Sequence, residues 1–275
     1  MAHSLFRLTE RLCNKPQLIA PQNLAVVVDY LFNRNIGKVE MKLDSKPNSQ
    51  RSPAYNKDYK AGLIPIYGSL TNIEYEPMCE EKACSYEEIV GNTQALIEKG
   101  AQTIVLDIDS GGGEAYGCFE AANRVRQLAN DAGVKIIAYV DGSAYSAAYA
   151  WAAIADEVVI NPMAGTGSIG VVVQLWDVSE AMAKEGYKRV FVYAGDAKIP
   201  YDADGKFRAD FIAEIQESVD ESYEMFVDHI ASHRSMSRDA VKATQAKTFN
   251  ANKSVELGLA DKIMTKQEFL DYVFA

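Results

Sequence analysis

The stretch that decides the fold is QTIVLDIDSGGGEAYGCFEAANRVRQLAND, residues 102–131. It opens with a continuous apolar run over 102–109, which is typical of a strand buried on both faces. Three glycines follow at 111–113, and the amphipathic segment 114–131 is expected to be a helix. A buried strand that leads through a glycine turn into a helix indicates a parallel sheet covered by helices. The stretch therefore predicts an α/β fold.

The same alternation of apolar strands and amphipathic helices continues on both sides of this stretch. Further helices are expected over 85–100, 178–187 and 207–233, and Ser85 with Glu88 has the S-x-x-E form of a capping box. Strands are expected at LIPIYGSL (63–70), KIIAYVD (135–141), EVVINP (157–162), IGVVVQLWD (169–177) and RVFVYAG (189–195). Such alternation predicts repeated βαβ units with right-handed crossovers and a mostly parallel sheet.

The N-terminal part of the chain differs from the rest. Residues 22–33 have an amphipathic pattern, so residues 1–41 are expected to form an N-terminal helical segment. Residues 42–61 are rich in Ser, Pro, Asn and Lys without an apolar period, which predicts a flexible linker. The main domain is expected to cover residues 62–275.

Composition excludes several classes of protein. The chain has 275 residues, of which 48% are hydrophobic and 24% charged, as in ordinary globular proteins. Its net charge of -10 argues against nucleic acid as a partner, because phosphate binding needs clustered Lys and Arg. The longest nearly apolar run, 144–155, is shorter than the roughly 20 residues of a membrane span, and the N-terminus lacks an apolar signal core. No membrane anchor and a cytoplasmic location are expected.

Metal ligands and cofactor motifs are sparse. Cys79 and Cys84 have C-x4-C spacing, but no second pair or nearby His completes a zinc set. His229 and His233 lie four residues apart on a helix without the glutamate of an H-E-x-x-H motif, which favours a solvated helix face. The sequence therefore predicts neither a metal site nor a cofactor.

The glycine turn at 111–113 permits more than one interpretation. A phosphate loop needs Lys followed by Ser or Thr after its last glycine, and here Glu114 and Ala115 follow. The dinucleotide motif G-x-G-x-x-G is broken at Tyr116. Two interpretations stay open: the glycines direct backbone N–H groups into an oxyanion site, or they only allow a tight turn.

Ser146 begins a run of small residues and also has two interpretations. Small residues in a helix usually serve close packing, but Ser146 follows a buried strand at an expected helix start, where nearby amides stabilise developing negative charge. A nucleophilic serine needs a base. A histidine could serve only if His229 or His233 folds back. The alternative is Lys198, which follows an apolar stretch where partial burial would lower its pKa.

Four short motifs resemble those of the signal peptide peptidase A family of serine peptidases, which shares the ClpP/crotonase-like fold. They are S-G-G-G at 110–113, S-A-A-Y at 146–149, G-S-I-G-V at 167–171 and G-D-A-K at 195–198. Their order and spacing fit the family, and the resemblance extends over roughly residues 62–265. One position departs from it, because Gly111 stands where the family usually has proline.

The resemblance implies a Ser–Lys dyad. Ser146 would attack the peptide carbonyl, and Lys198 would act as the base. Ser168 would orient the lysine, and the backbone N–H groups of Gly112 and Ala147 would form the oxyanion hole. Gly113 and Gly167 would contact the substrate. No cofactor or metal is implied.

The resemblance also implies a biological setting. The N-terminal segment and polar linker are similar to the tailed-phage branch, whose members cleave scaffold and capsid proteins during procapsid maturation. Family members form rings, so a homo-oligomer is expected, and whether the Ser146–Lys198 pair forms within one chain or across an interface stays open. Two alternatives stay open: a bacterial cytoplasmic protease similar to signal peptide peptidases, and a non-proteolytic crotonase-like protein.

Overall fold

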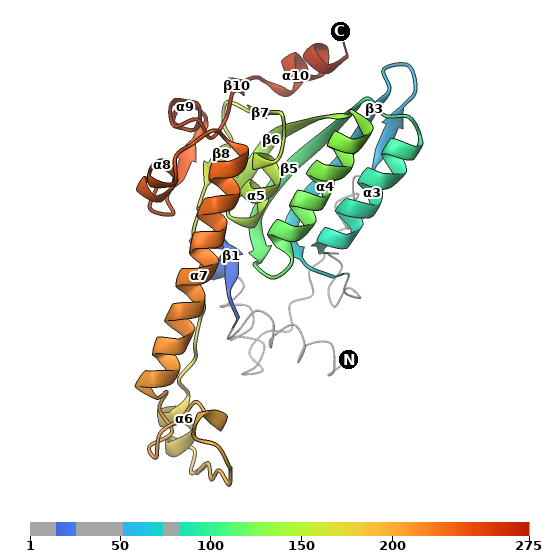
Figure 1. Cartoon of the computed structure of the whole chain (residues 1–275). Coiled ribbons are helices and arrows are strands. Elements are labelled where there is room, and N and C mark those ends of the chain that lie inside the picture. The colour runs from blue at the N-terminus through green and yellow to red at the C-terminus, as the bar shows by residue number, and fades with distance from the viewer. Residues whose placement is uncertain (1–14, 26–51, 74–82, 275) are drawn as a thin grey trace.

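The structure, a computed structural model, describes residues 15–25, 52–73 and 83–274 (Figure 1). A single ten-stranded sheet forms the centre of this described part. Its strands are β1 (Gln17–Ile19), β2 (Ala54–Asn56), β3 (Ala61–Thr71), β4 (Cys84–Ser85), β5 (Thr103–Glu114), β6 (Lys135–Tyr145), β7 (Glu157–Ile160), β8 (Gly165–Gly167), β9 (Thr248–Asn250) and β10 (Lys262–Ile263).

The sheet is mostly parallel. Its main path runs in the order β10-β7-β6-β5-β3-β2, and every pair along it is parallel except β2 with β3. Four short strands lie off this path: β4 pairs in parallel with β3, β8 pairs in parallel with β6, β9 pairs antiparallel with β8, and β1 pairs antiparallel with β5. The predicted α/β fold with a mostly parallel sheet is confirmed.

Helices cover both faces of the sheet. They are α3 (Tyr86–Glu98), α4 (Cys118–Ala132), α5 (Ala147–Ala153), α6 (Ser179–Lys184), α7 (Ala209–His233), α8 (Arg238–Ala243), α9 (Ala251–Glu256) and α10 (Lys266–Val273), with a 3-10 turn, η1, at Asp196–Lys198. Figure 1 shows α3, α4 and α5 on one face. On the other face, Phe269 of α10 stacks on Tyr139 with ring centroids 4.3 Å apart. As predicted, the Ser85 side chain caps α3 by accepting from the Glu88 N–H.

Two of the predicted strands are wrong. RVFVYAG, residues 189–195, forms no strand, and its Val192 side chain is 99% exposed. Within residues 169–177 the structure has only one bridge, between Val172 and Gln17. Both segments have the apolar composition of strands, but a strand also needs a neighbour to pair with, and apart from the bridge at Val172 neither segment has one in the described ranges.

The N-terminal segments contain strands that the sequence did not predict. β1 lies inside the expected helical segment 1–41, although residues 21–25 are helical. β2 lies inside the expected linker 42–61 and pairs with β3 through a turn at 57–60. The remainder of both segments lies outside the described residues, so the domain boundaries stay a prediction.

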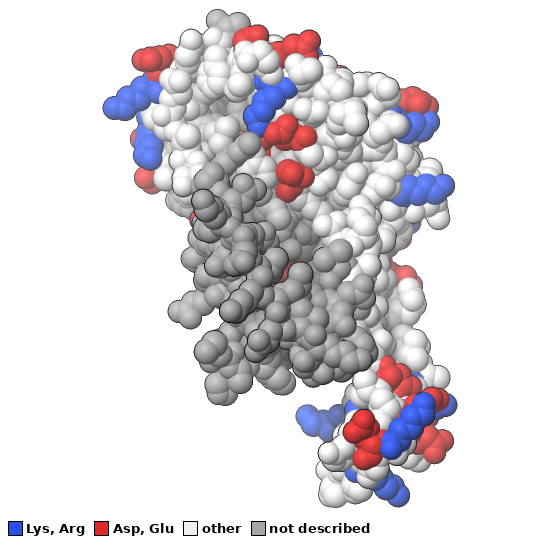
Figure 2. All heavy atoms as spheres, turned by 180° about the vertical axis from the view of Figure 1, so that it is seen from behind, with Lys and Arg blue, Asp and Glu red and all other residues white. Residues whose placement is uncertain are grey.

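A distal lobe, residues 178–208, projects from the body of the molecule. Figure 1 shows it, with α6, at the N-terminal end of the long helix α7, while the C-terminal half of α7 lies beside α5. The lobe carries basic and acidic side chains on the face shown in Figure 2. None of the helices in the described ranges has both the length and the hydropathy that a bilayer span requires.

The glycines at the end of β5 allow neighbouring backbones to approach closely. A Cβ on Gly113 would lie 1.9 Å from the carbonyl oxygen of Leu70 in β3. A Cβ on Gly112 would lie 2.2 Å from the carbonyl oxygen of Leu18 in β1. A Cβ on Gly111 would meet only the exposed Asn23 side chain, which can rotate away.

We expect Gly113→Ala to destabilise the fold and Gly111→Ala to be tolerated. The added methyl at position 113 collides with backbone that cannot move alone, and such overpacking costs roughly 1–3 kcal/mol. Denaturant unfolding of the two variants and the parent measures the difference. Equal unfolding midpoints for the two variants would show that the close approach to Leu70 does not constrain this position.

His229 packs between α7 and α5 rather than facing solvent, which corrects the predicted solvated helix face. Its Nε2 lies 3.0 Å from the Ala150 carbonyl oxygen, and its ring centroid lies 5.2 Å from that of Phe119. Burial lowers the pKa of His229 from 6.5 to about 4. The ring is therefore neutral in the folded chain at pH 7.

We expect the free energy of unfolding to decrease as the pH falls from about 6.5 toward about 4, the interval set by the two pKa values of His229. In this interval the unfolded chain binds a proton on the imidazole that the folded chain does not. The contribution lost at pH 4.5 is about 2–3 kcal/mol. Denaturant unfolding at pH 7 and pH 4.5 should show a smaller decrease for His229→Gln than for the half-buried control His233→Gln. An unchanged decrease in His229→Gln would contradict the assignment.

Candidate active site

Ser146 occupies the sharp turn between β6 and α5. Its φ of 56° and ψ of -119° lie in a region that residues with a side chain rarely adopt. Such strain is found most often at functional sites, where surrounding structure holds it in place. Here the Ser146 N–H donates to the Gly167 carbonyl at 2.8 Å, and the Ser146 carbonyl accepts from the Tyr149 N–H at 2.9 Å.

The Ser146 hydroxyl is buried and has no hydrogen-bond partner among the described residues. A buried hydroxyl without a partner costs free energy, because it has lost its bonds to water. The residues of α5 are all buried, and the Tyr149 hydroxyl anchors the helix by donating to the Leu259 carbonyl at 2.9 Å. The small residues of α5 therefore serve packing. Packing alone does not explain why Ser146, at the start of the helix, keeps a buried hydroxyl without a hydrogen-bond partner.

The glycines 111–113, which the sequence placed in a turn, form the end of β5 and lie directly beside Ser146. Ser110 of β5 pairs with Ala144 of β6, and the Tyr145 carbonyl oxygen lies 3.0 Å from the Cβ position of Gly112. The Gly112 N–H, a predicted oxyanion donor, donates at 3.1 Å to the Ser110 hydroxyl, which in turn donates to the Gly68 carbonyl at 2.6 Å. The other predicted donor belongs to Ala147, the first residue of α5, whose N–H has no acceptor within the helix.

Ser168 lies next to Ser146 in space. β6 and β8 are parallel and pair Tyr145 with Gly167, so each serine is the residue that follows its strand. Ser168 also has a positive φ, 54°, and its N–H donates to the Lys247 carbonyl at 2.8 Å. Gly167 contributes through its carbonyl, which holds the Ser146 N–H.

The structure does not bring Lys198 to Ser146 within one chain. Lys198 is exposed in the distal lobe, near the start of α7, where Arg208 donates to the neighbouring Ile199 carbonyl at 3.4 Å. Val219 of α7 lines the same pocket as Ser168, so it marks the position of the site along the helix. Arg208, which contacts the residue after Lys198, lies eleven helical residues before Val219, and eleven residues of helix span about 16 Å. A lysine side chain cannot bridge this separation.

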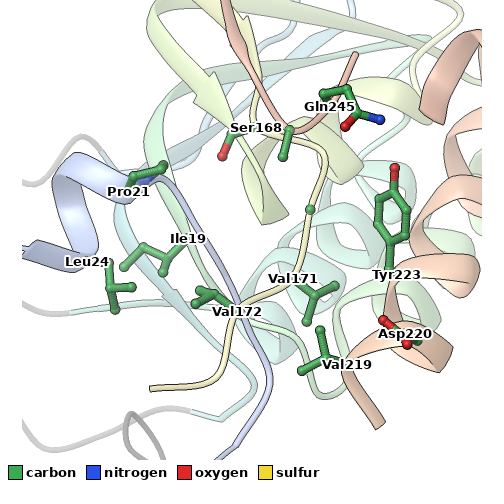
Figure 3. Close-up of a pocket in the computed structure, with 12 residues that line it drawn as sticks. Ile19, Pro21, Leu24, Ser168, Val171, Val172, Val219, Asp220, Tyr223 and Gln245 are labelled. Carbon is green, nitrogen blue, oxygen red and sulfur yellow. The ribbon is translucent and has the colours of Figure 1, made fainter. Parts of the chain in front are cut away.

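An apolar pocket with a volume of about 440 Å³ opens beside Ser168. Figure 3 shows Ile19, Pro21 and Leu24 on one side and Val219, Asp220 and Tyr223 of α7 on the other. Ser146 does not line this pocket. The N-terminal wall was absent from the sequence prediction, because a three-residue strand leaves no periodic signal.

Among the described residues, no group of three or more His, Cys, Asp or Glu side chains is placed to hold a metal ion. Cys79 of the C-x4-C pair lies outside them. The Cys84 thiol donates to the Pro65 carbonyl at 3.9 Å, and burial raises the pKa of the Cys118 thiol to about 12. His229 of α7 contacts the carbonyl of Ala150, one turn of α5 after Ser146, through its Nε2.

The curated relatives of this chain include two phage proteins. The chain is 24% identical over 287 residues to the head-tail preconnector protein GP5 of Enterobacteria phage P21, covering 98% of this chain and 57% of that protein. It is 24% identical over 229 residues to the capsid assembly protease C of Escherichia phage lambda, covering 82% and 51%. The chain thus spans about half the length of these curated relatives.

Among solved structures, a ClpP1 mutant from Listeria monocytogenes is similar with a TM-score of 0.49 and 13% identity, covering 78% of this chain and 95% of that one. The model of peptidase family S49 matches residues 128–273, which is more than half of the chain and includes Ser146, Ser168 and Lys198. This chain is therefore a member of peptidase family S49.

Proposed function

We propose that the protein is a serine endopeptidase with a Ser–Lys dyad in which Ser146 is the nucleophile. The observation that carries this proposal is the Ser146 hydroxyl, which is buried without a partner on a strained turn between the glycine loop and Ser168. Membership of a peptidase family supports it. A crotonase-like protein without a nucleophile would leave this strained and orphaned serine unexplained.

In the proposed reaction, the Ser146 oxygen attacks the substrate carbonyl while a neutral Lys198 takes its proton. The lysine then passes the proton to the leaving amine, and water hydrolyses the acyl-enzyme by the reverse roles. The N–H groups of Gly112 and Ala147 stabilise the oxyanion. The Gly112 N–H must turn from the Ser110 hydroxyl toward the substrate for this step, and Gly111, which lacks the fixed φ of proline, allows such a change.

We propose further that Lys198 comes from a neighbouring copy of the chain. Lys198 is exposed and remote from Ser146 of its own chain, so an oligomer is needed to unite them. The distal lobe also exposes apolar side chains that a partner would cover. These side chains are Tyr187, Val190, Phe191, Val192 and Tyr193.

Protein substrates follow from the chemistry, and the phage relatives indicate which ones. One relative is named a capsid assembly protease and another a head-tail preconnector protein. We propose that this chain cleaves scaffold or capsid proteins during procapsid maturation.

We expect Ser146→Ala and Lys198→Ala to be inactive separately and to recover activity when mixed. A mixed oligomer contains contacts that join an intact Ser146 to an intact Lys198 from the other variant. Peptide-hydrolysis rates before and after co-refolding measure the recovery. Lys188→Ala, in the same lobe, is the matched control and should keep activity close to that of the parent.

The result of mixing separates the two parts of the proposal. Inactive variants that stay inactive after verified mixing would contradict a dyad between copies. Full activity of either single variant would contradict its catalytic role.

Co-expression tests the proposed substrates. We expect the wild-type chain, co-expressed with phage scaffold and capsid proteins, to shorten them, and Ser146→Ala to leave them intact. Mass spectrometry of the products gives the cleavage sites. Identical shortening in the presence of Ser146→Ala would exclude Ser146 as the nucleophile for these substrates.

A further inference from the structure

We propose that residues 17–20 occupy the peptide groove of this chain as an intramolecular pseudosubstrate that must leave before another peptide can bind. This inference rests on the proposed function for the identity of the groove. The residues concerned are Gln17, Leu18, Ile19 and Ala20, which were not part of any predicted site.

The segment is held along both edges by main-chain hydrogen bonds. On one edge, β1 pairs antiparallel with the end of β5, in the register Gln17 with Glu114, Leu18 with Gly113 and Ile19 with Gly112. On the other edge, the Gln17 N–H donates to the Val172 carbonyl at 2.9 Å, and the Val172 N–H donates back at 3.0 Å. An extended peptide added to exposed sheet edges is recognised in this way.

The register places this segment beside Gly112, close to the turn at Ser146. Ile19 lies opposite Gly112, the predicted oxyanion donor, and the next N–H, of Ala20, donates to the Gly111 carbonyl at 2.8 Å. The chain direction therefore runs from Glu114 toward the glycine turn beside Ser146. A peptide substrate that pairs with β5 in the same sense would need the positions that these residues fill.

Burial indicates what the groove accepts. Leu18 and Ala20 have no exposed surface, and Ile19 is only 7% exposed. Ile19 also faces the pocket of Figure 3, whose N-terminal wall includes Pro21 and Leu24. The groove thus takes an extended apolar peptide with a small residue after the one opposite Gly112, and withdrawal of the segment removes one wall of the pocket.

Tethering makes this occupant effective. A segment joined to its own binding site has an effective concentration in the millimolar range, so weak contacts suffice to keep it bound. A free peptide must compete with that concentration. The groove is consequently closed in the isolated chain, which agrees with the complete burial of Ser146.

A binding experiment in the full-length chain tests the proposal. The background is Ser146→Ala, and the probe is a fluorescent peptide with the sequence of residues 15–24, KPQLIAPQNL. Leu18→Asp places a charge in a buried position and should release the segment. Gln22→Asp, an exposed position four residues away, is the matched control.

We expect Leu18→Asp to bind the peptide at least tenfold more tightly than the background or Gln22→Asp, as measured by fluorescence anisotropy. Gln17→Pro removes the N–H that bonds to Val172. It is the second releasing variant if thermal melting shows that Leu18→Asp does not fold. Equal affinities in all folded variants, or no binding by a folded releasing variant, would overturn the proposal. Because the assay needs no Ser146 hydroxyl, failure of the proposed function would appear only in the cleavage experiments above.

Discussion

The hydrogen bond from the Ser146 N–H to the Gly167 carbonyl joins the two turns on which the site depends. It ties the end of β6 to the end of β8, so the positive φ of Ser146 and that of Ser168 are set by the same pair of parallel strands. Strain of this kind, roughly 1–3 kcal/mol per residue, persists only when neighbouring structure fixes it. Here the buried helix α5 on one side and the Lys247 carbonyl on the other supply that constraint.

The glycine turn has a related requirement. Gly112 and Gly113 lie where backbone from β1 and β3 comes closer than any side chain would allow. The absence of a Cβ that permits this close packing is also compatible with the oxyanion role that the proposed function gives to the Gly112 N–H. In the described structure the Gly112 N–H bonds to Ser110, so the proposed oxyanion role requires a change in this arrangement.

The elements that the sequence predicted well are those with a local signal. The buried strand and helix around residues 102–131, the Ser85 cap and the turn at Ser146 each depend on residues close together in the chain. β1 could not be predicted, because its three residues have no period and its partner lies almost a hundred positions later. RVFVYAG failed for the opposite reason, since its composition is that of a strand but it pairs with no strand among the described residues. The position of Lys198 relative to Ser146 depends on the length and direction of α7, which no motif spacing encodes.

The length of α7 has a consequence for when the enzyme works. Its 25 residues hold the distal lobe, with Lys198, away from the serine of the same chain. Under the proposed arrangement a lone copy carries both halves of the dyad and can use neither. Proteolysis then depends on the local density of the protein: dilute chains stay inert during synthesis, and chains crowded into a particle become active together. Under the proposed arrangement, the length of α7 would therefore make cleavage depend on assembly.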